Sequence, residues 1–144
     1  MYVFLREVMA SPRAPYVYKL MTPSDWASMQ RDGFFDGSPH DKGDGFMHFS
    51  DAAEVPLTAR LYYKGTVALL KIDVAKLGPE VEMRWDYVAE RSTYFPHMFA
   101  VPVGEGSGAP TPTSLLMAAV VAVCDESIYV DFLETLLFVF LLQK

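Results

Sequence analysis

Two of the three histidines in this sequence stand where a side chain could do acid–base or ligand chemistry near neutral pH. His48 lies in Phe-Met-His-Phe-Ser, residues 46–50. Alternate residues of a strand share a face, so we expect His48 and Ser50 together at the end of a strand, with a helix start directly after them. This position suits a ligand-facing edge. The structural alternative is a histidine bonded to a backbone carbonyl and a serine that caps the helix.

A second predicted strand carries a cation and a carboxylate. Residues 84–86 read Arg-Trp-Asp, so Arg84 and Asp86 share one strand face and Trp85 lies on the other. On the structural interpretation the two charges form a surface ion pair, which contributes about 0–1 kcal/mol. On the functional interpretation the guanidinium binds a ligand.

The other histidine of interest, His97, follows Tyr-Phe-Pro at residues 94–96. Proline favours an extended entry, so we expect a strand to begin at His97. Its ring either binds a ligand or makes buried contacts that stabilise the strand. If His48, Arg84 and His97 converge, they form a cationic pocket in an acidic protein, which suits a phosphate or carboxylate ligand.

Metal and nucleophile chemistry are disfavoured by the spacing. His48 and His97 are far apart in the sequence, unlike the ligands of zinc-binding loops, so no metal site is expected. Cys124 lies in an apolar run with no flanking base to activate its thiol. Ser50 lacks the Gly-x-Ser-x-Gly turn of a nucleophilic serine. The stretch 36–45, which holds His40, lacks the central glycine and final glutamate of a calcium loop and is interpreted as a mobile acidic loop.

Composition indicates a globular protein of one domain. The chain has 144 residues, of which 51% are hydrophobic and 21% charged, with a formal net charge of −6. That negative charge disfavours electrostatic binding to nucleic acid or anionic lipid over a broad surface. A single cysteine excludes an internal disulfide, and we expect a cytoplasmic, reducing location. No secretory signal is predicted, because Arg6 and Glu7 interrupt the apolar start of the chain.

Strands dominate the predicted elements. The first strand covers residues 16–20, and a helix follows with Thr22 as N-cap, Pro23 in its first turn and Gly33 as its stop. The other predicted elements are strands 46–50, 67–73, 81–87, 97–103 and 115–124, a helix from 56 to before 65, and a short turn 74–77 capped by Asp73. Helices follow the first two strands and the last one but do not alternate with strands throughout. The order therefore favours an α+β fold, a compact single domain with a split, mostly antiparallel sheet.

The sequence divides into a domain and two flanking segments. Residues 1–15 are predicted to be a flexible leader, the domain covers 16–124 with a Gly/Pro-rich insertion at 104–113, and an apolar helix covers 125–144. Acidic residues break the C-terminal segment into pieces too short to span a membrane. A helix that is apolar nearly all round must be buried, so residues 128–142 are a candidate homodimer interface.

Several motifs occur together in an order that resembles one family of small proteins. Residues 18–20 read Tyr-Lys-Leu and are followed by Thr22 and Trp26. The other matching motifs are Gly-Phe-Met-His-Phe-Ser at 45–50, Leu-Leu-Lys-Ile-Asp at 69–73, Arg-Trp-Asp at 84–86 and Phe-Pro-His-Met-Phe at 95–99. Over residues 16–103 and the strand near 120–123, the chain resembles the uncharacterised DUF952 family.

The resemblance implies a fold similar to that of the ADP-ribosyltransferases, in which a split sheet forms a cleft for NAD or a related nucleotide. By that likeness Lys19, Arg84 and His97 would contact phosphate, while His48 and Ser50 would orient the ribose. Lys19 stands where the family more often has a histidine. Fold similarity alone does not confer transferase chemistry.

The favoured interpretation is a module that binds a nucleotide or a phosphate-bearing small molecule between His48, Arg84 and His97, without turnover. One alternative is an NAD-dependent ADP-ribosyl- or phosphotransferase-like enzyme, with His48, Asp86 and His97 as catalytic candidates. Its stabilising carboxylate would come from Glu82, Asp86 or Glu90. The other alternative is an interaction module that dimerises through its C-terminal helix.

Overall fold

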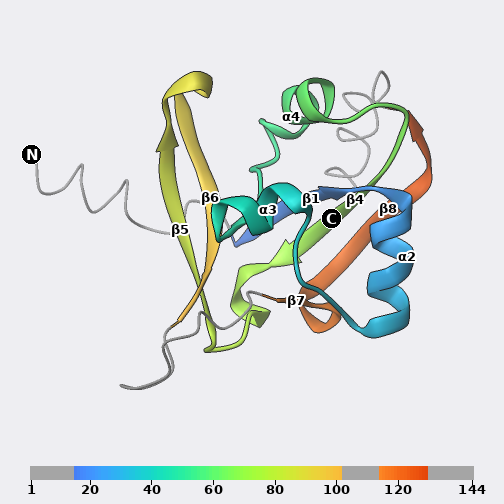
Figure 1. Cartoon of the computed structure of the whole chain (residues 1–144), viewed down its shortest axis with the longest axis horizontal. Helices are drawn as coiled ribbons and strands as arrows, with labels where there is room; N and C mark the ends of the chain where they lie inside the picture. Colours follow the sequence, from blue (N-terminus) through green and yellow to red (C-terminus); the bar gives the residue numbers. More distant parts are fainter. Residues whose placement is uncertain (1–14, 102–113, 130–144) are drawn as a thin grey trace, which may run out of the picture.

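The computed structural model describes residues 15–101 and 114–129, and its strands form three antiparallel sheets (Figure 1). The first sheet has the order β1-β4-β8, formed by Tyr16–Met21, Thr66–Asp73 and Val120–Tyr129. The second has the order β3-β6-β5, formed by Met47–His48, Thr93–Ala100 and Val81–Val88. The third pairs β2 (Phe34–Phe35) with β7 (Leu115–Leu116). The predicted α+β class with mostly antiparallel sheets is confirmed.

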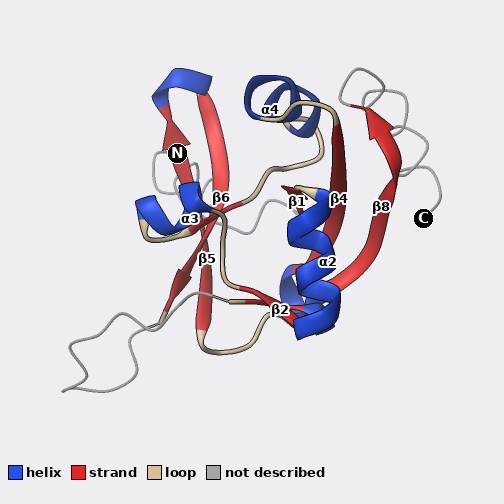
Figure 2. Cartoon of the chain, turned by 45° about the vertical axis from the view of Figure 1, so that its right-hand side comes forward, coloured by secondary structure: helices blue, strands red, loops and turns tan. Residues whose placement is uncertain are grey.

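A backbone bridge connects the first two sheets. The amide of Tyr18 donates to the carbonyl of Ser50 at 2.8 Å, and the amide of Ser50 donates to the carbonyl of Tyr18 at the same distance. Two residues earlier, His48 pairs with β6. The segment 47–50 therefore ties the β5–β6 hairpin to β1, and the two sheets lie side by side in Figures 1 and 2.

Helix α2 (Pro23–Asp32) forms as its end signals predict. The Thr22 hydroxyl accepts from the amide of Asp25 at 3.1 Å, and Gly33 closes the helix with a left-handed φ of 84°. This conformation strains residues with a Cβ. Trp26 and Met29 point from α2 into the core, so the helix covers one face of the β1-β4-β8 sheet (Figure 2).

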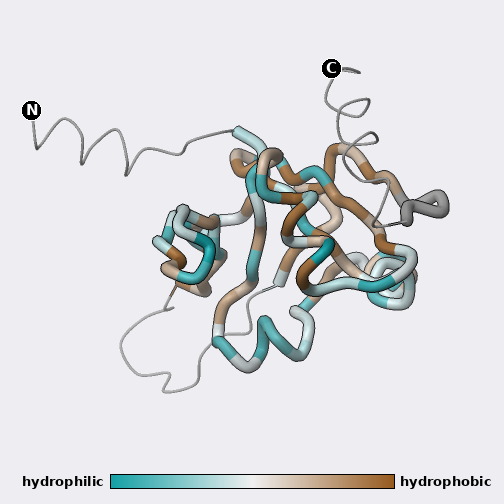
Figure 3. Tube along the Cα trace, turned by 90° about the horizontal axis from the view of Figure 1, so that it is seen from above, coloured by the Kyte–Doolittle hydropathy of each residue, from teal (hydrophilic) through white to brown (hydrophobic). Residues whose placement is uncertain are grey.

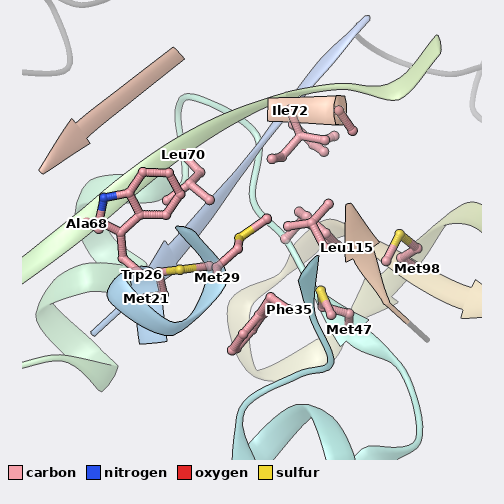
Figure 4. Packing of buried hydrophobic residues seen from close by; sticks show 13 residues of the cluster. Met21, Trp26, Met29, Phe35, Met47, Ala68, Leu70, Ile72, Met98 and Leu115 are labelled. Carbon is pink, nitrogen blue, oxygen red and sulfur yellow. The ribbon is translucent and has the colours of Figure 1, made fainter. Parts of the chain in front are cut away.

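The core lies on both faces of β4. Leu70 and Ile72 pack with Met29 and other members of the larger apolar cluster, whereas Val67 and Leu69 belong to a smaller cluster below α4 (Val55–Tyr62). Figure 4 shows the larger cluster, and in Figure 3 the hydrophobic stretches lie inside while hydrophilic turns lie at the margins. Because both faces of β4 are covered, residues 67–70 are apolar in succession rather than alternating with polar ones.

One predicted loop is a helix. Residues Pro39–Asp44 form α3, within the stretch interpreted as a mobile acidic loop. The Ser38 hydroxyl accepts from the amide of Asp41, and the Asp41 carboxylate accepts from the amide of Ser38, which completes a capping box. Turn-forming residues dominate the composition, but Ser-Pro-x-Asp is also a helix-start pattern, and Gly45 ends the helix in the left-handed region.

Strand β6 begins at Thr93, four residues before the predicted start at His97. Pro96 therefore lies inside a strand that has a neighbour on each side. In an antiparallel strand the N–H and C=O of a residue point to the same neighbour. The Pro96 carbonyl accepts from the amide of Phe49 at 3.0 Å, so its missing N–H faces the end of β3 and leaves the pairing with β5 complete.

The chain after residue 114 also departs from the prediction. Leu115–Leu116 and Val120–Tyr129 are two strands separated by a turn of 3-10 helix at Met117–Ala119. Residues 125–129, predicted to begin a helix, continue β8 beside β4. The predicted leader, the Gly/Pro-rich insertion and the rest of the C-terminal helix lie outside the described residues. Within the described ranges, no helix is long and apolar enough to cross a membrane.

Candidate functional site

Strand register brings three predicted site residues into one line. His48 on β3 is the cross-strand partner of His97 on β6, and His97 is the partner of Arg84 on β5. Directly opposed residues of antiparallel strands project from the same face. His48, His97 and Arg84 therefore form a transverse line across the β3-β6-β5 sheet, which we call the basic row.

Aromatic rings surround the basic row. The Phe46 ring lies 4.8 Å from that of His48, 4.5 Å from that of His97 and 4.9 Å from that of Phe99, between ring centroids. The Arg84 guanidinium lies over the Phe99 ring at 4.4 Å. Phe46 and Phe99 are half-buried, and the Arg84 side chain is 52% exposed. This face of the sheet thus presents an accessible planar cation beside partly accessible aromatic rings.

Asp86 orients His97. Its Oδ2 lies 2.8 Å from His97 Nδ1, across the β5–β6 pair. Burial lowers the pKa of His97 below its ordinary value, and the hydrogen bond to Asp86 opposes that shift. The lowered pKa favours the uncharged ring at neutral pH, and the tautomer with its proton on Nδ1 donates to Asp86. The Nε2 lone pair is left to accept a proton from a ligand or substrate.

A buried ion pair lies beneath His48. Lys19 Nζ donates to Asp41 Oδ2 at 2.9 Å and to the carbonyl of His48 at 2.7 Å, and the Lys19 side chain is 5% exposed. Burial would raise the pKa of Asp41, but hydrogen bonds from His48 and the charge of Lys19 hold it well below its ordinary range. Burial also lowers the pKa of Lys19, and Asp41 opposes that shift. The pair fixes where α3 meets β3.

His48 is flanked by two carboxylates. Its Nδ1 lies 2.7 Å from Asp41 Oδ1, and its Nε2 lies 2.9 Å from Asp44 Oδ2. The backbone amide of His48 also donates to Asp41 Oδ1 at 2.9 Å. Asp41 thus holds both the backbone and the ring of His48. At Nε2, either a proton or another cation can lie between the imidazole and Asp44.

Two other predicted ligand residues lie apart from the basic row. The Lys19 ammonium is turned inward to Asp41 rather than toward the exposed guanidinium of Arg84. Ser50 is buried, and its hydroxyl donates to Thr58 Oγ1 at 3.4 Å, below α4. Of the predicted ligand set, the structure brings His48, His97 and Arg84 together, with Asp86 attached to His97.

The other predicted carboxylates and the cysteine lie elsewhere. Glu82 Oε2 accepts from Arg84 Nη2 at 3.2 Å at the exposed edge of β5, and Glu90 lies in the exposed turn between β5 and β6. Cys124 is half-buried on β8, opposite Leu69.

The sequence analysis missed Asp41 and Asp44, and it placed His40 in a mobile acidic loop. The His40 ring stacks on that of His48 at 4.3 Å, and its Nε2 lies 3.7 Å from Asp44 Oδ2. The available signal was the capping box that begins at Ser38. Once α3 is recognised, His40 and Asp44 are one turn apart on one helix face.

Arg91 is a further polar residue that the sequence analysis missed. Its guanidinium, 7% exposed, donates to Glu54 Oε2 at 2.8 Å and to Thr58 Oγ1 at 3.2 Å, and lies over the Phe95 ring at 4.7 Å. It connects the β5–β6 turn to the start of α4. No local pattern in the sequence points to this pairing, because its members are distant along the chain.

Comparison with known proteins gives a family and a fold. The family model described as "Protein of unknown function (DUF952)" matches residues 20–109, which is more than half of the chain. The crystal structure of protein CC0527 from Caulobacter crescentus is similar, with a TM-score of 0.60 and 25% identity over 76% of this chain and 84% of that one. Its solution NMR structure has a TM-score of 0.59 and 23% identity over 82% and 90% of the two chains. No curated protein matches.

Proposed function

The chain belongs to the DUF952 family of proteins of unknown function, and from that premise we propose that it binds a nucleotide, or a related phosphate-bearing small molecule, on the basic row. The observation that supports the proposal is the register that aligns His48, His97 and Arg84 on one face of three strands. Strand pairing fixes the backbone positions from which these side chains project, so the backbone needs no ordering when a ligand binds.

Arg84 is the group best placed to hold the phosphate. A guanidinium offers five N–H donors in a planar fork, of which Nη2 contacts Glu82 at 3.2 Å. Stacking over Phe99 limits the side chain to few orientations. An anion can therefore take the remaining donors without Arg84 leaving its place.

The rings beside the row suit the base of a nucleotide. Phe46 and Phe99 are half-buried and touch one another, which leaves part of an aromatic surface next to the cation. A base stacked on an aromatic side chain contributes about 1–3 kcal/mol, whatever the base. A stacked base would then place its phosphate near Arg84.

Protonation of the buried His97 gives this binding its pH dependence. His97 is uncharged near neutral pH and bonded to Asp86, so its positive charge becomes available only as the pH falls. A bound phosphate favours the imidazolium form and raises the pKa of His97. Binding of a phosphate ligand is therefore expected to strengthen as the pH falls toward the pKa of the ring.

One observation favours a catalytic role as a second candidate. Asp86, bonded to His97 Nδ1 at 2.8 Å, leaves Nε2 as a proton acceptor, which is the arrangement of a general base and its orienting acid. An ADP-ribosyl- or phosphotransferase-like reaction would use His97 in that role. This candidate rests on the likeness to ADP-ribosyltransferases that the sequence motifs imply, and turnover of NAD by the purified chain would test it.

Calorimetry with ADP-ribose and AMP tests the binding proposal. Saturable binding of either nucleotide is expected, with adenosine, which lacks the phosphate, bound more weakly. Arg84→Ala should weaken AMP binding, whereas Arg31→Ala should not, because Arg31 is an exposed arginine paired with a neighbouring aspartate on α2. Equal effects of the two substitutions, or equal affinity for AMP and adenosine, would contradict the proposal.

A further inference from the structure

We propose that His40, Asp44 and His48 bind a divalent transition-metal ion such as Zn²⁺. Each residue offers one ligand atom, and the three atoms all lie within 4.8 Å of one another. We call these residues the metal cluster. Two of the chain's three histidines thus converge on one carboxylate.

The spacing of the ligand atoms fits one small ion. Asp44 Oδ2 lies 2.9 Å from His48 Nε2 and 3.7 Å from His40 Nε2. Zinc bonds of about 2.0–2.1 Å in tetrahedral geometry hold neighbouring ligand atoms about 3.3 Å apart. The two observed distances lie on either side of that value, and the ligand atoms of His40 and His48 lie within 4.8 Å of one another. The two rings are stacked, so binding requires the exposed His40 ring to rotate toward the ion.

The fold presents these ligands from two elements that are already fixed. His40 and Asp44 are one turn apart on α3, which the capping box at Ser38 begins and Gly45 ends. His48 follows on β3, where it pairs with β6. Figure 1 shows α3 beside β6, so the ligands come from two neighbouring elements.

Asp41, which is outside the metal cluster, supports the assignment independently. Its Oδ1 lies 2.7 Å from His48 Nδ1, where it can accept the Nδ1 proton, while Nε2 is directed at Asp44. Metal-binding histidines regularly donate their other ring N–H to a carboxylate in this way. Lys19 and the amide of Ser38 hold Asp41 Oδ2 in turn.

The ligand types select the class of ion. Two imidazoles and one carboxylate suit zinc and other first-row transition ions, whereas calcium and magnesium prefer oxygen ligands alone. In the described part of the chain, the ion-pair partners of Asp44 are the imidazoles of His40 and His48, while Lys42 pairs with Asp36. Three protein ligands leave a coordination position for water or another ligand.

This inference goes beyond the proposed nucleotide binding. His48 belongs to both groups, but His40 and Asp44 lie outside the basic row, and Arg84 and His97 lie outside the metal cluster. Failure of one proposal therefore leaves the other standing. Arg84→Ala should weaken nucleotide binding and leave zinc binding unchanged.

Calorimetry of the tag-free chain with Zn²⁺ tests the metal cluster. We expect saturable binding of one ion per chain, and its loss in His40→Ala and in Asp44→Asn. The side chain of His40 is 68% exposed, so its removal should leave the fold intact. Asp36→Asn, at another exposed acid paired with Lys42, is the matched control and should bind zinc as the native chain does.

A second readout identifies the ligand atom. On zinc addition the His48 Nε2 signal in imidazole ¹⁵N NMR should shift while Nδ1 stays protonated, whereas the His97 nitrogens should keep their pattern. The inference is overturned if no saturable zinc binding occurs, or if His40→Ala and Asp44→Asn bind zinc as tightly as Asp36→Asn does.

Discussion

His48 and His97 face one another across β3 and β6, with ring centroids 5.3 Å apart and ring planes at 75°. Each imidazole has its own carboxylate on Nδ1, Asp41 for His48 and Asp86 for His97. The two histidines are therefore neighbours with fixed and separate orientations. His48 Nε2 lies close to Asp44 at the end of α3, and His97 is the cross-strand partner of Arg84.

The Lys19–Asp41 ion pair should dominate the stability of this region. Asp41→Asn leaves a buried ammonium without its counter-charge, so we expect a loss of about 3–5 kcal/mol in the free energy of unfolding, measured with urea. Asp32→Asn removes a partner of an exposed pair with Arg31 and should change it by about 0–1 kcal/mol. Similar losses in the two variants would show that the buried ion pair contributes no more to the free energy of unfolding than the exposed pair does.

Acid should destabilise the protein through His97. Its folded-state pKa lies below the ordinary value of 6.5, so the unfolded chain takes up a proton more readily. The stability contributed by the neutral ring is present above pH 6.5 and is lost as the pH falls toward the folded-state pKa. His97→Gln should flatten the fall of unfolding free energy in this window, which is at most about 1.4 kcal/mol per pH unit for one proton. An unchanged slope in the variant would assign the effect to other groups.

Asp41 also makes the protein less stable as the pH falls, but at a lower pH than His97 does. Its folded-state pKa is depressed, so its contribution is present above the ordinary value of 3.8 and is lost as the pH falls further. Above pH 5, denaturation by urea should therefore report His97 with little contribution from Asp41.

Removing the carboxylate beside His97 should lower the pKa of the ring further. In Asp86→Asn the burial that lowers this pKa remains, but the hydrogen bond to a charged acceptor is lost. NMR titration of His97 measures the change directly. Asp73→Asn, at an exposed cap on the opposite sheet, is the control and should leave the His97 titration as it is. A rise in Asp86→Asn would mean that Asp86 does not stabilise the imidazolium.

The N-cap of α3 should contribute measurably to the stability of the protein, although it lies in a polar stretch of the sequence. Ser38→Ala removes the acceptor for the amide of Asp41, and N-cap substitutions of this kind lower stability by about 0.5–2 kcal/mol. Urea denaturation measures the loss, and Ser24→Ala, at an exposed position inside α2, is the comparison at a serine that is not a helix cap. Equal stability of the two variants would mean that the capping box contributes nothing to holding Asp41.

Local signals predicted most elements correctly. Thr22, Pro23 and Gly33 predicted both ends of α2, Asp73 predicted its short turn, and an apolar run predicted β4. These features depend on residues within a few positions of one another. Helix α3 shows the limit, because Ser38 and Asp41 carry a valid capping box inside a stretch whose glycines and aspartates favour turns.

The candidate site was predictable only in part. His48, Arg84 and His97 were selected by type, and register then placed them in one line. Lys19 was expected near phosphate but pairs with Asp41, a partner 22 residues away that no local pattern identifies. The start of β6 was predicted wrongly because Pro96 was expected to precede the strand. Whether a proline can lie inside a strand depends on which neighbour its missing N–H faces, and the sequence does not show this.

The most direct test of the central claim, that the basic row binds a phosphate-bearing nucleotide, is an NMR titration of the ¹⁵N-labelled chain with ADP-ribose. The account predicts saturable shifts at the side-chain nitrogens of Arg84 and His97 and at the backbone amide of Phe99, with smaller changes at Arg31 on α2. It also predicts a rise in the pKa of His97 when the ligand is bound. Shifts that avoid β5 and β6, or a His97 titration that the ligand leaves unchanged, would contradict it.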